Sequence, residues 1–213
     1  GDELDLLNNL PQAVATALQQ AERPVVIVGG GALRYDGVQA ATLALAKQYN
    51  LVREGWNGYN LLHLAAARMG GLTLGYAKAG GINALAKTKP RLGFFLGADE
   101  VDYELFAKCF KVYIGHHGDQ GAAAADVILP AAAFSEKSGT YVNNEGRVQI
   151  ADRAVFPPGD AREDWAIFRA LSAALGQELP FDSLEECRAM MVESFPLLAE
   201  NAAIGYQWPA TNH

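Results

Sequence analysis

Residues 125–150 read ADVILPAAAFSEKSGTYVNNEGRVQI, and this stretch constrains the fold more than any other part of the chain. Val127–Pro130 is an apolar run closed by proline. It predicts a short strand buried on both faces, because proline cannot donate a hydrogen bond to a sheet. Thr140–Val142 and Arg147–Ile150 then alternate between polar and apolar residues. We expect a hairpin there, in which Gly146 takes the positive φ that such a loop needs at its last position.

The composition fits one α/β domain with an appendage. The chain has 213 residues, 50% of them hydrophobic, and a formal net charge of −7, so it can bury a substantial core. The negative charge argues against a nucleic-acid surface, which needs clustered lysine and arginine. The longest apolar runs are too short to span a bilayer, and no signal-peptide pattern is present. We expect a soluble domain without direct membrane insertion.

The cysteine pattern argues against a cysteine-ligated metal site. Cys109 and Cys187 lie far apart, and neither belongs to a C-x-x-C or similar spacing, so we expect no iron–sulfur or zinc site. Both are expected to be reduced, partly buried thiols. The chain begins Gly1-Asp2-Glu3 without an initiator methionine, and we expect it to be a piece of a longer polypeptide.

Apolar runs alternate with helical patterns through most of the chain. Besides the stretch above, buried strands are predicted at Val25–Val28, Leu51–Val52, Arg91–Leu96 and Phe110–Ile114. Helices are predicted at Pro11–Gln20, Gly37–Tyr49, Asn60–Met69, Ile82–Ala86 and Asp102–Ala107, with a loop at Gly55–Gly58. This alternation favours an α/β fold with a doubly wound, mostly parallel, Rossmann-like sheet.

The last part of the chain is predicted to be helical. Helical patterns cover Asp164–Leu175 and Ser183–Ser194. Ser183 and Glu186, three residues apart, form a capping box at the start of the second helix. We therefore expect an α/β domain with a small β-hairpin over residues 1–160. A helical C-terminal appendage over residues 161–213 would belong to the same compact unit.

Several blocks of sequence together resemble a known family. They are Gly115–Asp119, Ala125–Pro130, Glu136–Asn143, Asn144–Gln149, Pro157–Gly159 and Ala161–Trp165. These blocks are similar to the late part of the molybdopterin oxidoreductase fold. Within that fold they resemble the C-terminal region of the large iron–sulfur subunit of NADH-quinone oxidoreductase, complex I. The resemblance runs from about Pro24 to about Pro196.

This resemblance implies a non-catalytic scaffold and docking domain. The parent complex would transfer electrons from NADH to quinone and translocate protons, so the chain would be part of an enzyme without being catalytic itself. In the family the iron–sulfur clusters lie in N-terminal domains that this sequence lacks, and no cofactor is expected in this piece. The implied partners are other domains of the same subunit and other peripheral-arm subunits. The implied location is peripheral, on the cytoplasmic face of the bacterial plasma membrane or the matrix side of the mitochondrial inner membrane.

Two other interpretations stay open. The chain could be a fragment of a true molybdopterin-dependent oxidoreductase. Residues 22–32 also resemble the central domain of thiamine-diphosphate enzymes, which binds nucleotides in some members. The hairpin stretch speaks against that second family.

A glycine-rich turn follows the first predicted strand. Gly29-Gly30-Gly31 stands between a strand and a helix, the context of a dinucleotide fingerprint, but Arg34 occupies the position of the third glycine. Glu54 follows the second predicted strand, about where a ribose-binding acid would lie. In the resembled family this turn does not hold NADH, so we expect a tight turn without a cofactor.

Four carboxylates cluster after the strand predicted at 91–96, namely Asp99, Glu100, Asp102 and Glu104. The carboxyl end of a strand is where open α/β sheets bind ligands. Catalytic molybdenum enzymes of the resembled family carry a proline-containing turn here that faces the guanine nucleotide, and this chain has Glu100 in place of the proline. Because like charges would repel a pyrophosphate, we expect a solvated acidic turn.

Three histidines are weak candidates for ligands. His116 and His117 are adjacent and project in different directions in an extended chain, and with Asp119 they lack a third histidine or cysteine ligand. We expect a hydrogen-bonded loop there. His63 should be a packing histidine on the helix predicted at 60–69.

The hairpin stretch also carries serines beside charged residues. Ser135 and Ser138 lack the G-x-S-x-G elbow of a nucleophile and an indicated base. Cross-strand or edge charges that hold the hairpin are expected from Glu136, Lys137, Glu145 and Arg147. We therefore assign no catalytic, cofactor-binding or metal-binding residue in this chain.

Overall fold

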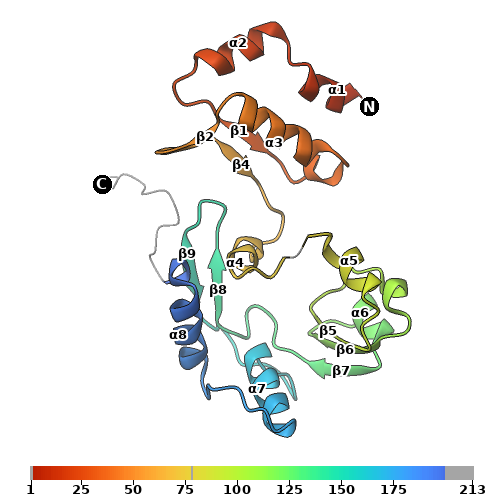
Figure 1. The fold of residues 1–213 in the computed structure, drawn as a ribbon. Coiled ribbons are helices and arrows are strands. Elements are labelled where there is room, and N and C mark those ends of the chain that lie inside the picture. Colours follow the sequence, from red (N-terminus) through yellow and green to blue (C-terminus); the bar gives the residue numbers. More distant parts are fainter. Residues whose placement is uncertain (1, 78, 200–213) are drawn as a thin grey trace. The chain divides into compact units, whose positions relative to one another are not determined.

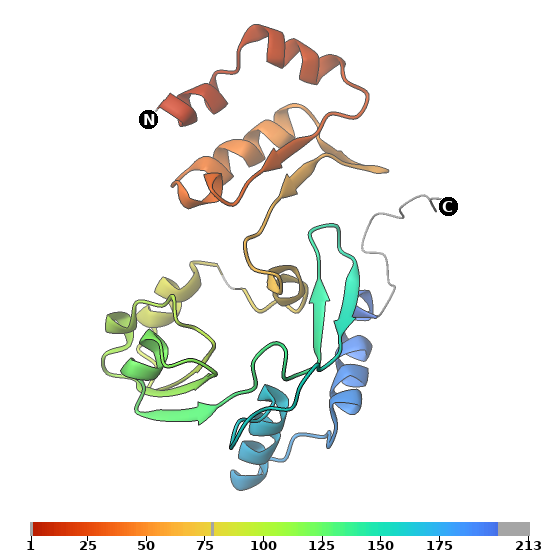
Figure 2. The ribbon, with the colours of Figure 1, turned by 180° about the vertical axis from the view of Figure 1, so that it is seen from behind.

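The computed structural model describes residues 2–77 and 79–199. The chain divides between residues 69 and 70 into two compact units. Figure 1 and Figure 2 show the course of the chain from opposite sides.

The first unit pairs two distant strands beside a helix. Its elements are α1 (Asp2–Asn8), α2 (Gln12–Gln20), β1 (Val26–Val28), η1 (Ala32–Arg34), α3 (Val38–Gln48), β2 (Val52–Arg53), β3 (Trp56–Asn57) and β4 (Tyr59–Leu61). β1 and β4 are parallel, whereas β2 and β3 form a short antiparallel hairpin. The buried centre consists of Leu45, Ala46 and Leu51, with side chains of α2, β1 and β4 packed against it.

Polar contacts fix α3 against the sheet. The Thr42 hydroxyl donates to the carbonyl oxygen of Val38 at 2.9 Å and lies 3.0 Å from the hydroxyl of Tyr59 in β4. The Trp56 indole donates to the carbonyl oxygen of Pro24 at 3.0 Å, just before β1. Because Thr42 is buried, these partners satisfy a hydroxyl that would otherwise destabilise the core.

The helix predicted at Asn60–Met69 is wrong. Tyr59–Leu61 forms β4, which lies in register with Val26–Val28, and the next helix, α4 (Arg68–Thr73), starts only at Arg68. The Leu62 N–H donates to the carbonyl oxygen of Val28 at 2.9 Å and extends the ladder. A local helical pattern is overridden here because a distant strand offers these residues a backbone partner.

Three smaller expectations for the first unit are also corrected. The second strand covers Val52–Arg53 instead of Leu51–Val52, and Trp56–Asn57, predicted as loop, is the other half of its hairpin. The first strand is not buried on both faces, since Val28 is 4% exposed but Ile27 is 62% exposed. β1 is therefore covered on one face only.

The second unit contains a parallel sheet of three strands. β5 (Leu92–Leu96), β6 (Phe110–Gly115) and β7 (Val127–Pro130) lie in that order. The connections are η2 (Tyr103–Phe106) and α6 (Gln120–Ala124), and α5 (Gly81–Lys87) precedes β5 (Figure 1). The predicted helix at 102–107 is thus one turn of 3₁₀ helix, and α6 is a helix that the sequence pattern did not indicate.

Side chains of this sheet alternate between two faces. Phe95 and Tyr113 point to one face and pack with η2 and with alanines of α5 and α6. Val112 and Ile114 point to the other face, where Phe168 of α7 (Asp164–Ala174) joins them. Layers on both faces are what a parallel sheet requires. β7 is nevertheless an edge strand with Val127 and Ile128 partly exposed, so the prediction that it is buried on both faces is wrong.

The predicted hairpin is confirmed. β8 (Gly139–Val142) pairs antiparallel with β9 (Val148–Ala151), and Gly146 has φ of 82°. The Asn143 side-chain oxygen accepts hydrogen bonds from the N–H groups of Glu145 at 3.0 Å and Arg147 at 2.8 Å. The loop is therefore closed by one asparagine and one glycine.

The two C-terminal helices follow the predicted pattern. They are α7 and α8 (Leu184–Ser194), and a 3₁₀ turn, η3 (Pro196–Leu198), follows. The Ser183 hydroxyl caps α8 by accepting from the Glu186 N–H at 3.1 Å. The Glu186 carboxylate in turn accepts from the N–H of Asp182 at 2.6 Å, one residue earlier than in a standard capping box.

The observed architecture is mixed α/β with parallel pairing in both units. A single doubly wound sheet and the division at residues 160 and 161 stay predictions. Among the residues that the structure describes, no helix combines the length and the apolarity needed to cross a membrane.

Candidate functional site at the carboxyl edge of the sheet

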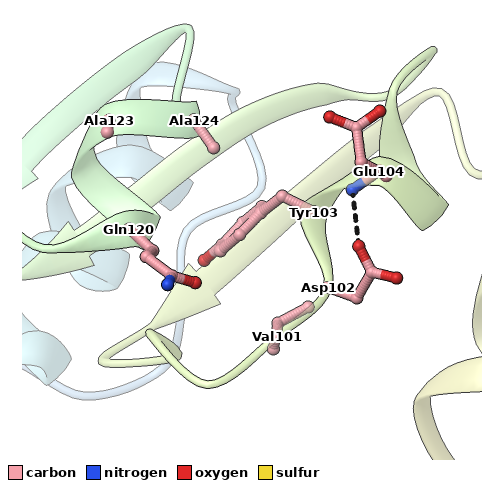
Figure 3. A pocket seen from close by; sticks show the side chains of 7 residues that line it. All are labelled: Val101, Asp102, Tyr103, Glu104, Gln120, Ala123 and Ala124. Atoms are coloured by element: carbon pink, nitrogen blue, oxygen red, sulfur yellow. Dashed lines mark hydrogen bonds between the residues drawn. The ribbon is translucent and has the colours of Figure 1, made fainter.

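Two pockets lie beyond the carboxyl ends of β5, β6 and β7. The first has a volume of about 370 Å³ and is lined by Val101, Asp102, Tyr103, Glu104, Gln120, Ala123 and Ala124 (Figure 3). The second has a volume of about 500 Å³ and includes Gly115–Gly118, Pro130, Glu136 and Asp160 in its lining. This edge is where an open parallel sheet would bind a ligand.

Asp99 occupies the centre of this edge and is turned inward. One carboxylate oxygen accepts from the hydroxyl of Tyr113 at 2.8 Å, and the other accepts from the N–H of Gly121 at 3.1 Å. Asp99 thus joins the end of β5 to β6 and to the first turn of α6. Burial, followed by the hydrogen bond to Asp99, raises the pKa of the Tyr113 hydroxyl to about 12.

The ring of Tyr113 fills the space at the carboxyl end of β6. Tyr113 is 1% exposed. A Cβ atom built on Gly115 would lie 2.4 Å from this ring, and one built on Gly121 would lie 2.3 Å from it. Both glycines therefore lack side chains because the tyrosine takes their place.

The first pocket is lined by acidic and uncharged side chains. The Asp102 carboxylate caps η2 by accepting from the Glu104 N–H at 3.1 Å, as the dashed line in Figure 3 marks. The Tyr103 hydroxyl donates to the carbonyl oxygen of Ala98 at 2.6 Å, and burial followed by the charge of Asp99 raises the pKa of Tyr103. No lysine or arginine is among the residues that line this pocket.

The second pocket holds two histidines that contact each other. The rings of His116 and His117 meet edge to face with centroids 4.3 Å apart, and neither ring forms a hydrogen bond with the described part of the chain. The Asp119 carbonyl oxygen accepts from the Ala123 N–H at 3.0 Å, which closes the first turn of α6 and does not hold the loop at His116 and His117 that was predicted to be hydrogen-bonded. The Glu136 carboxylate accepts from the Ala133 N–H at 2.9 Å. Within residues 2–77 and 79–199, no group of three metal-ligating side chains is found.

The sequence of this chain matches the family model described as molybdopterin oxidoreductase over residues 1–174. The chain belongs to the molybdopterin oxidoreductase family. The match includes residues 22–32, so the segment that also resembles thiamine-diphosphate enzymes is part of the same family.

Several similar proteins are subunits of NADH-quinone or NADH-ubiquinone oxidoreductases. The chain is 44% identical to the mitochondrial NADH-ubiquinone oxidoreductase 78 kDa subunit of Neurospora crassa, over 85% of this chain and 25% of that protein. It is 43% identical to the 78 kDa subunit of Candida albicans, over 95% of this chain and 28% of that protein. It is 39% identical to a subunit of the NADH-quinone oxidoreductase of Rickettsia bellii, over 93% of this chain and 30% of that protein. The chain thus spans less than a third of the length of these relatives.

The first pocket does not fit the nucleotide part of a molybdopterin cofactor. A pyrophosphate needs cationic groups or free backbone N–H groups, but the first pocket is lined by two carboxylates and no cation. The Gly121 N–H, in the first turn of α6, is already bonded to Asp99. In this member of the molybdopterin oxidoreductase family, Asp99 and the ring of Tyr113 fill the space at the carboxyl end of β6, beside the first turn of α6.

The glycine-rich turn is also unlike a dinucleotide site. It leads into η1, and α3 begins only at Val38, so no long helix starts at the glycines. The Ala32 and Leu33 N–H groups already donate to the Gly29 carbonyl oxygen. Glu54 lies in the turn between β2 and β3 and not beyond a parallel strand, which corrects its predicted position.

The remaining predicted residues have local contacts. His63 lies in an irregular segment between β4 and α4, not on a helix. The Ser138 hydroxyl accepts from the Arg153 N–H at 3.2 Å. Lys137 forms an ion pair with Asp164 of α7, so it ties the hairpin to that helix and not across the two strands.

Tyr113 and Tyr103, the two residues that shape the edge, were not predicted from the sequence. A usable signal was present, because Tyr113 and Gly115 share one face of β6 at spacing i, i+2. A large residue beside a glycine on a strand indicates that the ring lies over the glycine. The inward orientation of Asp99 had no such local signal.

Both cysteines are free thiols, as predicted. Cys109 is buried in the core around Phe95 and Tyr113. Burial raises the pKa of Cys109 and of Cys187, so both thiols are poor nucleophiles.

Proposed function

We propose that this chain is the non-catalytic scaffold and docking part of the large iron–sulfur subunit of NADH-quinone oxidoreductase, complex I, near the C-terminus of that subunit. Family membership and the named relatives support this assignment. The observation that carries the non-catalytic role is that Asp99 and Tyr113 fill the end of β6 and that Asp99 already accepts the Gly121 N–H of α6. A family member that fills this edge with a buried tyrosine has a fold suited to packing, not to cofactor chemistry.

The proposal extends to cofactors and partners. No catalytic, cofactor-binding or metal-binding residue belongs to this chain, and the iron–sulfur clusters of the parent lie in its N-terminal part. The partners are the other domains of the subunit and further subunits of the peripheral arm. The whole complex transfers electrons from NADH to quinone and translocates protons. In this proposal the chain lies on the cytoplasmic face of the bacterial plasma membrane or on the matrix side of the mitochondrial inner membrane.

The architecture of the parent is part of the same proposal. In the intact subunit the parallel strands of the chain belong to a doubly wound, molybdopterin oxidoreductase-like domain, to which the C-terminal helices are appended. The parallel pairing of β1 with β4 and of β5, β6 and β7 supports this.

Two measurements on purified proteins test the role. The chain alone should oxidise no NADH with ferricyanide or quinone as acceptor. Mixed with the N-terminal, cluster-bearing part of the parent subunit, it should co-elute on size-exclusion chromatography. Turnover by the chain alone, or the absence of any complex, would contradict the proposal.

Ligand measurements test the absence of a cofactor separately. Elemental analysis should find molybdenum, iron and zinc far below one atom per chain. NADH titration should give no binding tighter than roughly 100 μM, which corresponds to a binding free energy of about −5.5 kcal/mol. One metal atom per chain, or a lower dissociation constant for NADH, would contradict the proposal and would indicate that the chain binds a cofactor.

A further inference from the structure

The amino edge of the β5–β6–β7 sheet is basic in a chain that is acidic overall. Lys87 ends α5, Lys89 and Arg91 lie between α5 and β5, and Lys108 lies between η2 and β6. Because β5 and β6 are parallel and these four residues precede their amino ends, they lie at the end of the sheet opposite the acidic turn. The net charge of the whole chain is −7, so the charge of this edge is opposite in sign to that of the chain.

The four cations are exposed and form no ion pair with the described residues. None of Lys87, Lys89, Arg91 and Lys108 forms an ion pair with another residue in the described part of the chain, and all are exposed. The carboxylate at this edge, Asp126, instead accepts from the Lys111 N–H at 2.7 Å and lies 3.5 Å from the Lys111 ammonium. Asp126 thus neutralises a fifth cation and leaves the other four without a partner among the described residues.

An apolar row lies beside these cations. Leu92 is 51% exposed, Phe110 is 50% exposed and Val127 is 39% exposed. Leu92 and Phe110 face each other across β5 and β6, and Val127 pairs with Val112 one strand further on. All three point to the face that α7 covers only in part. Parallel strands are normally buried on both faces, so a row of this kind indicates a surface that another molecule covers.

We propose that the amino edge, defined as Leu92, Phe110 and Val127 with Lys87, Lys89, Arg91 and Lys108, is a docking surface for an acidic protein surface that carries apolar side chains. The proposal rests on the proposed function, because the partner is a component of the parent assembly. The row supplies area that excludes water, and the rim supplies orientation and selectivity.

The charge distribution favours a protein over an extended polyanion. A membrane or a nucleic acid covers more of the molecule than the amino edge, and the chain as a whole carries a net charge of −7, which opposes such a contact. A protein patch meets only the charges within about 10 Å, the screening length near 0.1 M salt, and there the four cations dominate. The apolar side chains also stand on strands, so the surface is preformed and binding costs little ordering.

A pair of matched charge reversals tests the surface in the full-length parent subunit. One variant carries K89E and K108E at the amino edge, and the control carries R34E and K47E, two exposed cations of the first unit that make no ion pair with the described residues. Each variant changes the net charge equally. The tagged subunit is purified from cells, and the NADH:ferricyanide activity that co-purifies with it is measured. This activity should fall about tenfold for the first variant, in the range expected for a charge reversal in an interface. It should stay within about twofold for the control, as for a surface change outside an interface.

A photo-crosslinking amino acid at position 110 identifies the occupant. In the assembled complex, adducts should form with a peptide rich in aspartate and glutamate, and the K89E/K108E variant should lose them. Adducts with lipid, or binding of the subunit to phosphatidylglycerol vesicles that K89E and K108E abolish, would show a membrane surface and overturn the proposal.

The remaining outcomes separate the two proposals. If the wild-type subunit is recovered with NADH:ferricyanide activity and both variants are recovered equally well, the docking surface is wrong and the proposed function stands. If the wild-type subunit itself is never recovered with that activity, the proposed function fails, and the docking surface fails with it.

Discussion

The two edges of the β5–β6–β7 sheet carry opposite charges and differ in how those charges are used. At the carboxyl edge Asp99 accepts hydrogen bonds from Tyr113 and Gly121, and Asp102 caps η2. At the amino edge four cations make no ion pair within the described residues. Clustered charge alone therefore does not mark a site. Asp99 and Asp102 stabilise the fold because they accept hydrogen bonds within the chain, whereas the cations stay available for another molecule.

The largest expected effect is steric and lies at the carboxyl edge. Gly121→Ala places a Cβ atom 2.3 Å from the Tyr113 ring, and overpacking of this kind should lower the free energy of unfolding by about 3 kcal/mol. Gly118→Ala is the control, because nothing lies within 4 Å of its Cβ position. Urea denaturation measures both. Equal midpoints for the two variants would mean that the ring does not fill the edge.

Removal of the Asp99 carboxylate should have a somewhat smaller effect. Asp99→Ala leaves the buried Tyr113 hydroxyl and the Gly121 N–H without their acceptor, which should cost about 2 kcal/mol. Glu100→Ala removes an exposed neighbour of the same charge and should change stability by less than about 0.5 kcal/mol. If both variants unfold at the wild-type urea concentration, Asp99 is a solvated residue after all.

Alkaline pH tests the same contact by titration. The folded-state pKa of Tyr113 is raised to about 12, whereas an unfolded tyrosine titrates near pH 10. Between these values the unfolded chain binds fewer protons, so stability is intact below pH 10 and falls as the pH rises toward 12. The wild-type slope should exceed that of Tyr113→Phe by up to about 1.4 kcal/mol per pH unit. Parallel stability curves for the two proteins would exclude the raised pKa.

The same distinction between local and distant partners decides how far the sequence could predict this structure. Gly146 and Ser183 were predicted correctly, because their roles depend on neighbours within a few residues. β4 was missed because its partner, β1, precedes it by about 30 residues and local pattern cannot show the pairing. The burial of β7 was overestimated for a related reason. An apolar run does not reveal whether its strand lies at the centre or at the edge of a sheet.

The candidate site was predictable only as a location. The four carboxylates were placed correctly beyond β5, and the acidic character of the turn follows from composition. Asp99, Tyr113 and Gly121 come from three separate segments, and their meeting depends on the register of β5 against β6. The basic edge was not noticed in the sequence, because Lys108 becomes a neighbour of Lys89 and Arg91 only through that same register.

The smallest expected effect is that of charge reversal at the amino edge on the stability of the fold. Lys89 and Lys108 are exposed, and no carboxylate of the described chain pairs with them. Their reversal to glutamate should therefore change the free energy of unfolding by no more than about 0.5 kcal/mol. Thermal unfolding of K89E/K108E beside R34E/K47E measures this, and it also shows that a loss of assembly does not come from misfolding. A loss of more than about 2 kcal/mol for K89E/K108E alone would exceed the range of surface substitutions. That result would mean that these cations stabilise the fold, as the acids of the opposite edge do, and that the two edges do not differ in kind.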